Sequence, residues 1–210
     1  WCGQWRPSSV GTRALLPVHL FGQNAPMEEL LALAQKHGLH VVEDAAQSIG
    51  SDYLFSNGET RRSGTLGIIG CTSFFPSKTL GAFGDGGALF TRDGEMATQI
   101  RSIANHGQRI RYHYERIGMN SRLDSLQAAL LDFKLRHLDA YVKKKKKAAD
   151  YYDVHLQGVG DLLLPERRPW STHSFHQYTL RTSRRDALQA FLKERGAPAM
   201  AYYPKPLHLH

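Results

Sequence analysis

The fold is decided by the stretch PMEELLALAQKHGLHVVED, residues 26–44. Leucines at helical spacing follow its opening proline, which indicates an amphipathic helix. Gly38 then ends the helix, and the apolar run at 39–42 predicts a buried strand that finishes at Asp44. Another apolar run, at 15–20, predicts a strand before the helix. These segments together predict a β-α-β unit, and therefore a parallel sheet that binds ligands at the carboxyl ends of its strands.

The rest of the chain continues this α/β pattern. Residues 51–64 are polar and rich in turn residues, so they predict a loop or a hairpin. Apolar and β-branched residues predict strands at 68–75 and 88–91. Helical periodicity is present at 95–103 and over 124–152, and we interpret the longer stretch as one helix that leads from a large domain to a smaller one. The last predicted elements are a strand at 175–181, a helix at 184–195 and a strand at 199–203.

The composition is that of an ordered globular chain. With 210 residues and 41% hydrophobic content, the chain is long enough to bury a core. Two cysteines cannot build a disulfide framework, and no apolar run resembles a signal peptide or a membrane span, so we expect a cytoplasmic protein without a membrane partner. The net charge of +8 and the run Lys143–Lys147 raise the alternative of a nucleic-acid-binding protein. Apolar residues recur on both sides of this run at helical spacing, which favours a solvated lysine face and no nucleic-acid partner.

Three motifs resemble one known family. They are VVEDAAQ at 41–47, TSFFPSKTLG at 72–81 and GDGG at 84–87. Together they resemble the DegT/DnrJ/StrS-type family of nucleotide-sugar aminotransferases, which are fold-type I enzymes that use pyridoxal 5'-phosphate (PLP). The resemblance covers about residues 12–210 and implies a mostly parallel sheet flanked by helices. The organisation that it implies is an unmatched lead-in at 1–13, part of a large PLP-binding domain at 14–140 and part of a smaller C-terminal α+β domain at 141–210.

The resemblance implies a cofactor site around Lys78. PLP chemistry needs a lysine amine that traps the cofactor carbonyl as a Schiff base and then moves a proton, and Lys78 matches this position after a strand and beside glycines. Asp44 would face the pyridine nitrogen, although an aspartate there also suits a helix cap. Gln47 matches the residue that bonds the cofactor's ring oxygen, and Ser73 matches a phosphate contact. The glycines near Lys78 suggest backbone at positive φ, at Gly81, Gly84, Gly86 and Gly87.

Other matched residues imply a homodimer with shared active sites. Asn120 and Arg122 match positions that reach into the partner's site, where asparagine meets phosphate and arginine meets a substrate carboxylate or sugar polar groups. His106 and Tyr203 match substrate-pocket positions, with a structural histidine and a packed tyrosine as open alternatives. No metal site is expected.

The implied reaction is transamination. Glutamate would give its amino group to the PLP on Lys78, and a nucleotide-linked keto-sugar would receive it to form an amino sugar for polysaccharide. The motif at 72–78 together with 117–120 looks most like members that act on UDP-linked 3-keto sugars. A PLP-dependent sugar dehydratase is the alternative within the family. In such dehydratases a histidine replaces the cofactor lysine, so the presence of Lys78 argues against this alternative.

One part of the family pattern is not found in this sequence. Family members carry an amino-terminal helix start that holds the phosphate through backbone amides, and an aromatic ring that stacks on PLP. Residues 1–13 supply neither, and both ends of the chain read as truncated. We therefore expect the 210 residues alone to bind PLP weakly and to lack transaminase activity.

Overall fold

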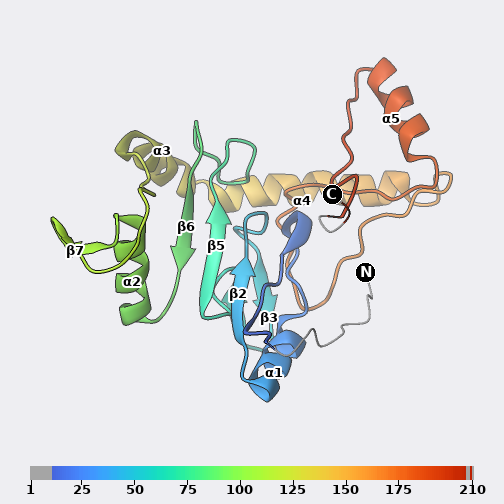
Figure 1. Cartoon of the computed structure of the whole chain (residues 1–210). Helices are drawn as coiled ribbons and strands as arrows, with labels where there is room; N and C mark the ends of the chain where they lie inside the picture. The colour runs from blue at the N-terminus through green and yellow to red at the C-terminus, as the bar shows by residue number, and fades with distance from the viewer. Residues whose placement is uncertain (1–10, 207–208, 210) are drawn as a thin grey trace.

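The computed structural model describes residues 11–206 and 209, and its centre is a four-stranded sheet (Figure 1). The strand order is β1 (Ala14–Leu15), β2 (His40–Asp44), β5 (Ile69–Ser73) and β6 (Gly87–Phe90). β1 and β5 run parallel to β2, while β6 pairs antiparallel with β5. The predicted α/β class with a mainly parallel sheet is therefore confirmed.

The predicted β-α-β unit forms, with a shorter first strand than expected. Pairing covers only Ala14–Leu15, and the 3-10 turn η1 (Leu20–Gly22) ends the run that was predicted as strand. Helix α1 (Met27–His37) follows, and its C-cap Gly38 adopts a left-handed φ of 63°. The apolar face of α1 packs on the sheet and the adjoining hairpin in a cluster of buried residues, Met27, Ala34, Val41, Tyr53 and Leu66.

Residues 51–64 form a hairpin, one of the two predicted outcomes. Its strands are β3 (Asp52–Leu54) and β4 (Thr60–Arg62). The hairpin also contacts a distant segment, because the backbone N–H of Leu54 donates to the carbonyl of Trp170 at 2.8 Å. This contact joins the later part of the chain to the β-α-β unit.

A separate group of elements follows β6. Helix α2 (Gly94–Ala104) begins at Asp93, whose carboxylate accepts hydrogen bonds from the N–H groups of Glu95 and Met96. The short strands β7 (Gln108–Ile110) and β8 (His113–Tyr114) then form a small ribbon that lies with α2 at one side of the molecule (Figure 1).

The single long helix predicted over 124–152 is wrong. The structure has two helices, α3 (Ser125–Leu135) and α4 (Leu138–Leu156), separated by a turn in which the N–H of His137 donates to the carbonyl of Lys134 at 3.0 Å. No glycine or proline marks this turn, so helical periodicity alone runs through it. The predicted domain boundary at residue 140 lies inside α4 and stays a prediction.

Two predicted strands in the last third of the chain are also wrong. Helix α5 (Arg185–Glu194) forms as expected, but 175–181 and 199–203 are irregular, apart from one bridge between Leu163 and Arg181. An apolar stretch becomes a strand only when a neighbouring strand completes its hydrogen bonds. In the described part of the chain these two segments have no such neighbour.

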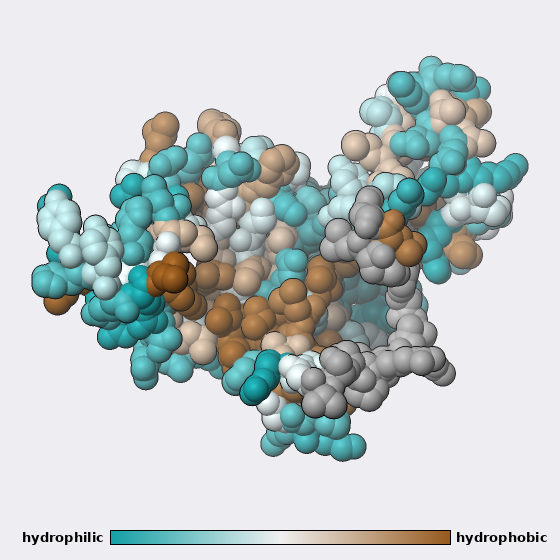
Figure 2. All heavy atoms as spheres, viewed as in Figure 1, coloured by the Kyte–Doolittle hydropathy of each residue, from teal (hydrophilic) through white to brown (hydrophobic). Residues whose placement is uncertain are grey.

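Apolar side chains remain exposed on one face of the molecule. Figure 2 shows them gathered over the middle of this face, in front of the sheet. Exposed apolar residues in and beside the strands include Leu16, Val18, Ile68 and Leu89. Within the described residues, no helix has the length and apolarity needed to cross a bilayer.

Candidate active site

Lys78 lies in the turn that follows β5. Its backbone N–H donates to the carbonyl of Phe75 at 2.8 Å, and its side chain is half-buried. Burial lowers the pKa of the Lys78 ammonium, while the nearby carboxylate of Asp44 acts in the opposite direction. The amine is therefore easier to deprotonate than a surface lysine, as a nucleophilic lysine requires.

Asp44 stands at the carboxyl end of β2, beside Cys71 of β5 in the strand register. Its Oδ1 accepts a hydrogen bond from the N–H of Ala46 at 3.0 Å, which caps a turn at 46–50 and not the helix considered from the sequence. Its charge also acts on Lys78, so the cap and the site role are compatible. The two residues of opposite charge predicted for the cofactor are thus brought together at one edge of the sheet.

Glu43 points to the opposite face of β2 and is fully buried. One carboxylate oxygen bonds the ring of His19 at 2.9 Å and accepts from the N–H of Gly64 at 3.0 Å. The other accepts from the N–H groups of Leu66 and Gly67, both at 2.6 Å. Glu43 is therefore an anchor for the chain before β5, a role that the sequence did not suggest.

Gln47 is buried and joins two segments that lie far apart in sequence. Its Oε1 accepts from the backbone N–H of Phe21 at 2.6 Å, and its Nε2 donates to the hydroxyl of Tyr203 at 3.0 Å. An amide nitrogen carries two hydrogens, so a second donor remains for a ligand. Two residues predicted separately for cofactor and substrate are thus in direct contact.

Ser73 is the last residue of β5, and its hydroxyl oxygen accepts from the N–H of Phe75 at 3.2 Å. The hydroxyl hydrogen can then be donated to an anion. Ser73 and Lys78 therefore lie at the two ends of the same short connection after the strand.

Asn120, Arg122 and His106 form a second, exposed group between α2 and α3. Asn120 bridges Asn105 through the backbone, and the N–H of His106 donates to the carbonyl of Met119 at 2.9 Å. No described contact joins this group to Lys78 or Asp44, so the chain by itself does not bring all the predicted residues together.

His176 is a residue of the site that the sequence reading missed. Burial, and then the charges of Lys78 and Lys145, lower its pKa to about 4. The backbone on both sides of His176 lies against η1, because the N–H of Ser174 donates to the carbonyl of Gly22 at 2.9 Å and the N–H of Gln177 donates to that of Phe21 at 3.3 Å. The paired histidines of HSFH, residues 173–176, were the only available signal.

Lys145 corrects the interpretation of the lysine run. The other four lysines of Lys143–Lys147 are exposed as expected, but Lys145 turns inward and donates to the hydroxyl of Thr79 at 3.1 Å. Burial lowers the pKa of this ammonium. The run is therefore not a uniform solvated face.

The glycines after Lys78 also act differently from the prediction. None of these four glycines has a positive φ. The described glycines that do have a positive φ lie elsewhere in the chain. They instead allow close approach: a Cβ on Gly81 would lie 2.3 Å from the carbonyl oxygen of Pro76, and one on Gly87 would lie 2.8 Å from that of Thr72. Their small size lets the loop fold tightly beside the sheet.

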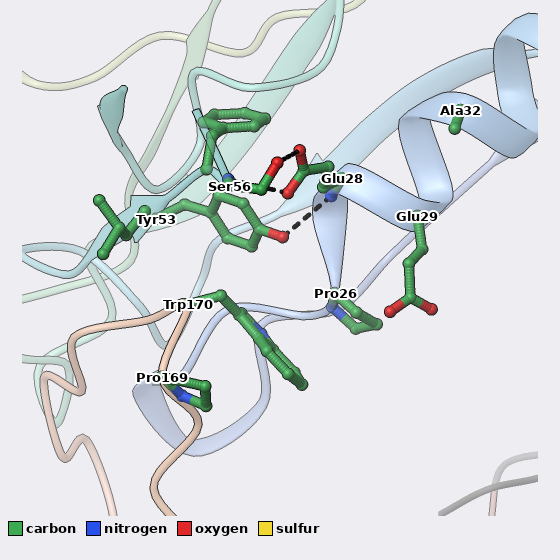
Figure 3. A pocket seen from close by; sticks show the side chains of 10 residues that line it. Pro26, Glu28, Glu29, Ala32, Tyr53, Ser56, Pro169 and Trp170 are labelled. Carbon is green, nitrogen blue, oxygen red and sulfur yellow. Dashed lines mark hydrogen bonds between the residues drawn. The ribbon is translucent and has the colours of Figure 1, made fainter. Parts of the chain in front are cut away.

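A hollow at the start of α1 lies apart from the group around Lys78. Figure 3 shows Tyr53, Trp170 and Pro169 beside the first turn of α1, where they line this hollow, and its volume is about 640 Å³. The Tyr53 hydroxyl accepts from the N–H of Glu28 at 3.0 Å. None of its lining residues belongs to the group around Lys78. The edge of the sheet at Lys78 and Asp44 remains the candidate active site.

Comparison with known proteins places the chain in a family. Residues 9–210 match the model of the DegT/DnrJ/EryC1/StrS aminotransferase family. The chain is 50% identical to a pleiotropic regulatory protein of Geobacillus stearothermophilus, 47% to a UDP-N-acetyl-3-dehydro-alpha-D-glucosamine 3-aminotransferase of Acidithiobacillus ferrooxidans and 45% to a dTDP-3-amino-3,4,6-trideoxy-alpha-D-glucose transaminase of Streptomyces venezuelae. Each match covers 94% of this chain but only 51–52% of the relative, so the chain spans about half the length of these curated relatives.

Solved structures agree with this assignment. The structure of S. venezuelae DesV with a ketimine intermediate superposes with a TM-score of 0.89 at 46% identity, covering 95% of this chain and 52% of that one. A Brucella abortus aminotransferase of the same family gives 0.87 at 40% identity, with 94% and 52% covered. A Bacillus subtilis protein, ntda, with bound cofactor PMP, gives 0.81 at 30% identity, with 95% and 45% covered. The fold is thus that of the aminotransferases of this family. The chain belongs to the DegT/DnrJ/EryC1/StrS aminotransferase family.

Proposed function

We propose that the protein of which these residues form part is a PLP-dependent aminotransferase that transfers the amino group of glutamate to a nucleotide-linked keto-sugar. The observation that carries the proposal is the position of Lys78 just after β5, within the influence of the charge of Asp44 at the carboxyl end of the adjacent strand β2. When bound, PLP supplies an electron sink that stabilises negative charge beside the transferred amine. The donor set around Lys78 fits this group, because it offers an amine, a carboxylate, an amide and a hydroxyl.

Each side chain would have one task. Lys78 would hold the cofactor covalently and carry the proton between substrate and cofactor, helped by the burial that lowers the pKa of its ammonium. Asp44 would keep the pyridine nitrogen protonated, since a carboxylate stabilises the positive charge there. Gln47 has a remaining amide hydrogen for the ring oxygen, and Ser73 has its hydroxyl hydrogen for the phosphate.

The sugar class is supported by relatives of two kinds. The A. ferrooxidans relative is named for a UDP-linked sugar and the S. venezuelae relative for a dTDP-linked one. Both names describe amino groups at carbon 3 of the sugar. We propose a 3-keto sugar substrate, with UDP preferred over dTDP because of the motif at 72–78 together with 117–120. A cytoplasmic location remains a prediction from the sequence.

We further propose that the active enzyme is a homodimer with shared sites. Asn120 and Arg122 lie apart from Lys78 in the chain and are exposed, as residues that serve a neighbouring subunit must be. Large apolar side chains are exposed around them, which is typical of a surface that a partner covers. These residues are Phe83, Ile117, Met119, Leu126 and Phe133.

Borohydride reduction tests the central assignment. The full-length protein would be incubated with PLP, reduced, digested and mapped by mass spectrometry, and we expect a phosphopyridoxyl group on Lys78. Lys145 is an internal control, because it is also half-buried and has a lowered pKa. A tag on Lys145 or any other lysine instead, with PLP bound, would rule out the assignment.

A further inference from the structure

The loop that carries Lys78 is fastened by side chains from both helices behind it. Three hydrogen bonds reach residues 79–83: Lys145 Nζ donates to Thr79 Oγ1 at 3.1 Å, Lys134 Nζ donates to the carbonyl of Gly81, and the N–H of Phe83 donates to Gln127 Oε1 at 2.8 Å. Gln127 and Lys134 belong to α3, and Lys145 belongs to α4. The turn between these helices therefore lets two separate elements hold one loop.

Apolar packing fixes the far side of the same loop. Leu80 and Ala82 are buried against Leu131 of α3 and Leu138 of α4. Thr79, between Lys78 and Leu80, is buried as well, with an exposed fraction of 7%. The position of the Lys78 backbone is thus set by its buried neighbours, and the hydroxyl of Thr79 is the polar group among them.

A lysine at position 145 would lower the stability of the fold without benefit if packing were its only role. Its ammonium is partly desolvated, as the lowered pKa indicates, and among the described residues it forms no ion pair with a carboxylate. A half-buried charge without a counter-ion costs stability, and an apolar side chain would avoid that cost. What the ammonium provides is a charge-assisted hydrogen bond to the residue next to Lys78.

We propose that Lys145 is a positioning residue for Lys78, acting through the hydroxyl of Thr79 to fix the direction in which the Lys78 amine is presented. The inference rests on the proposed function of Lys78 as the cofactor lysine. His176 lies beside both ammonium groups, which places Lys145 at the same site rather than on a remote surface. Lys134 supports the loop one step further along, at the carbonyl of Gly81.

The test measures Lys78 itself in the cofactor-free full-length protein. The rate at which acetic anhydride acylates Lys78 would be followed by peptide mass spectrometry from pH 7 to pH 10. This range lies below the ordinary lysine pKa of about 10.4, so the rate reports how readily the ammonium loses its proton. The variants are Lys145→Met, Lys145→Arg and Thr79→Val, and the matched control is Lys144→Met, an exposed neighbour on the same helix. The readout needs no PLP, so it is independent of the borohydride result.

We expect Lys145→Met and Thr79→Val each to change the acylation rate of Lys78 at least about twofold, the lower end of the coupling between residues in contact. Lys144→Met should leave the acylation rate unchanged, and Lys145→Arg should give a rate closer to that of the wild type than Lys145→Met does. The double variant, Lys145→Met with Thr79→Val, should change the rate no more than either single variant. A wild-type rate profile in folded Lys145→Met would overturn the proposal. If that variant does not fold, a wild-type profile in Thr79→Val, which keeps the side-chain shape, would overturn it.

Discussion

The side-chain amide of Gln47 donates a hydrogen bond to the hydroxyl of Tyr203 at 3.0 Å, across 156 positions of sequence. The same amide accepts from the backbone N–H of Phe21, so one buried residue fixes both the turn η1 and the end of the described chain. Tyr203 is otherwise largely exposed, with a fraction of 62%. The contact makes Tyr203 a support for Gln47, which is proposed to bind the cofactor, in addition to any contact with substrate.

The first prediction concerns this contact. Tyr203→Phe should weaken PLP binding about fivefold, because loss of one hydrogen bond of about 1 kcal/mol leaves Gln47 less well oriented. Tyr202→Phe is the matched control, since within the described residues its hydroxyl forms a hydrogen bond to the sulfur of Met200 alone. Equilibrium titration of the full-length protein, read by the cofactor's absorbance, measures both. Equal affinities in the two variants would mean that Tyr203 does not support the cofactor site.

The second prediction separates the neighbouring acids Glu43 and Asp44. Glu43→Gln should lower the free energy of unfolding by about 2 kcal/mol, because an amide cannot accept all the hydrogen bonds that the buried carboxylate accepts. Asp44→Asn should change it by less than about 0.5 kcal/mol, since the amide oxygen can still cap Ala46. The activity of Asp44→Asn should fall, because the pyridine nitrogen of the cofactor would no longer face a carboxylate.

Urea unfolding and kcat for both variants decide the matter. A large loss of stability in Asp44→Asn, with kcat retained in the molecules that remain folded, would make Asp44 a structural cap and remove it from the proposed mechanism.

The sequence predicted where the proposed site residues lie along the strands, because this depends on local order. Asp44 and Ser73 end two adjacent strands, and motif recognition placed Lys78 just after the second. The contact between Gln47 and Tyr203 could not be predicted, because it depends on a chain path that carries no local signal. The same holds for the break between α3 and α4, where no helix breaker occurs.

The inward turn of Lys145 was predictable in principle. It lies three residues after the partly buried Val142 and four before the buried Ala149, so helical periodicity puts all three on one face of α4. The five consecutive lysines hid this position, because a charge run suggests solvent on every side. Helical periodicity therefore indicates which lysine turns inward, and the charge of the run correctly indicates that the other four lysines are exposed.

The third prediction tests the shared dimer sites. A mixture of inactive Lys78→Ala and Arg122→Ala subunits should form heterodimers with about one intact site in two, as a two-fold interface requires. In the control mixture, Lys78→Ala with Asp44→Ala, both changes fall on the same side of the site, so no intact site can form. Activity measured after confirmed subunit exchange distinguishes the two cases. Equal recovery in both mixtures, or none in the first, contradicts sharing.

The last prediction is a loss of stability in acid that two histidines cause. In the cofactor-free protein, burial lowers the pKa of both His173 and His176 from 6.5 to about 4. The positive charge of Arg167 contributes to this lowering at His173, against the opposing charge of Asp153, and the charges of Lys78 and Lys145 contribute to it at His176. Because the unfolded chain takes up protons first, the free energy of unfolding should fall as the pH drops from about 6.5 to about 4, by up to about 1.4 kcal/mol per pH unit for each histidine. His176→Gln should make this slope shallower, whereas His113→Gln, at an exposed site, should leave it unchanged. Urea unfolding at intervals across this range measures the slope, and an unaltered slope in His176→Gln would show that His176 titrates normally in the folded protein.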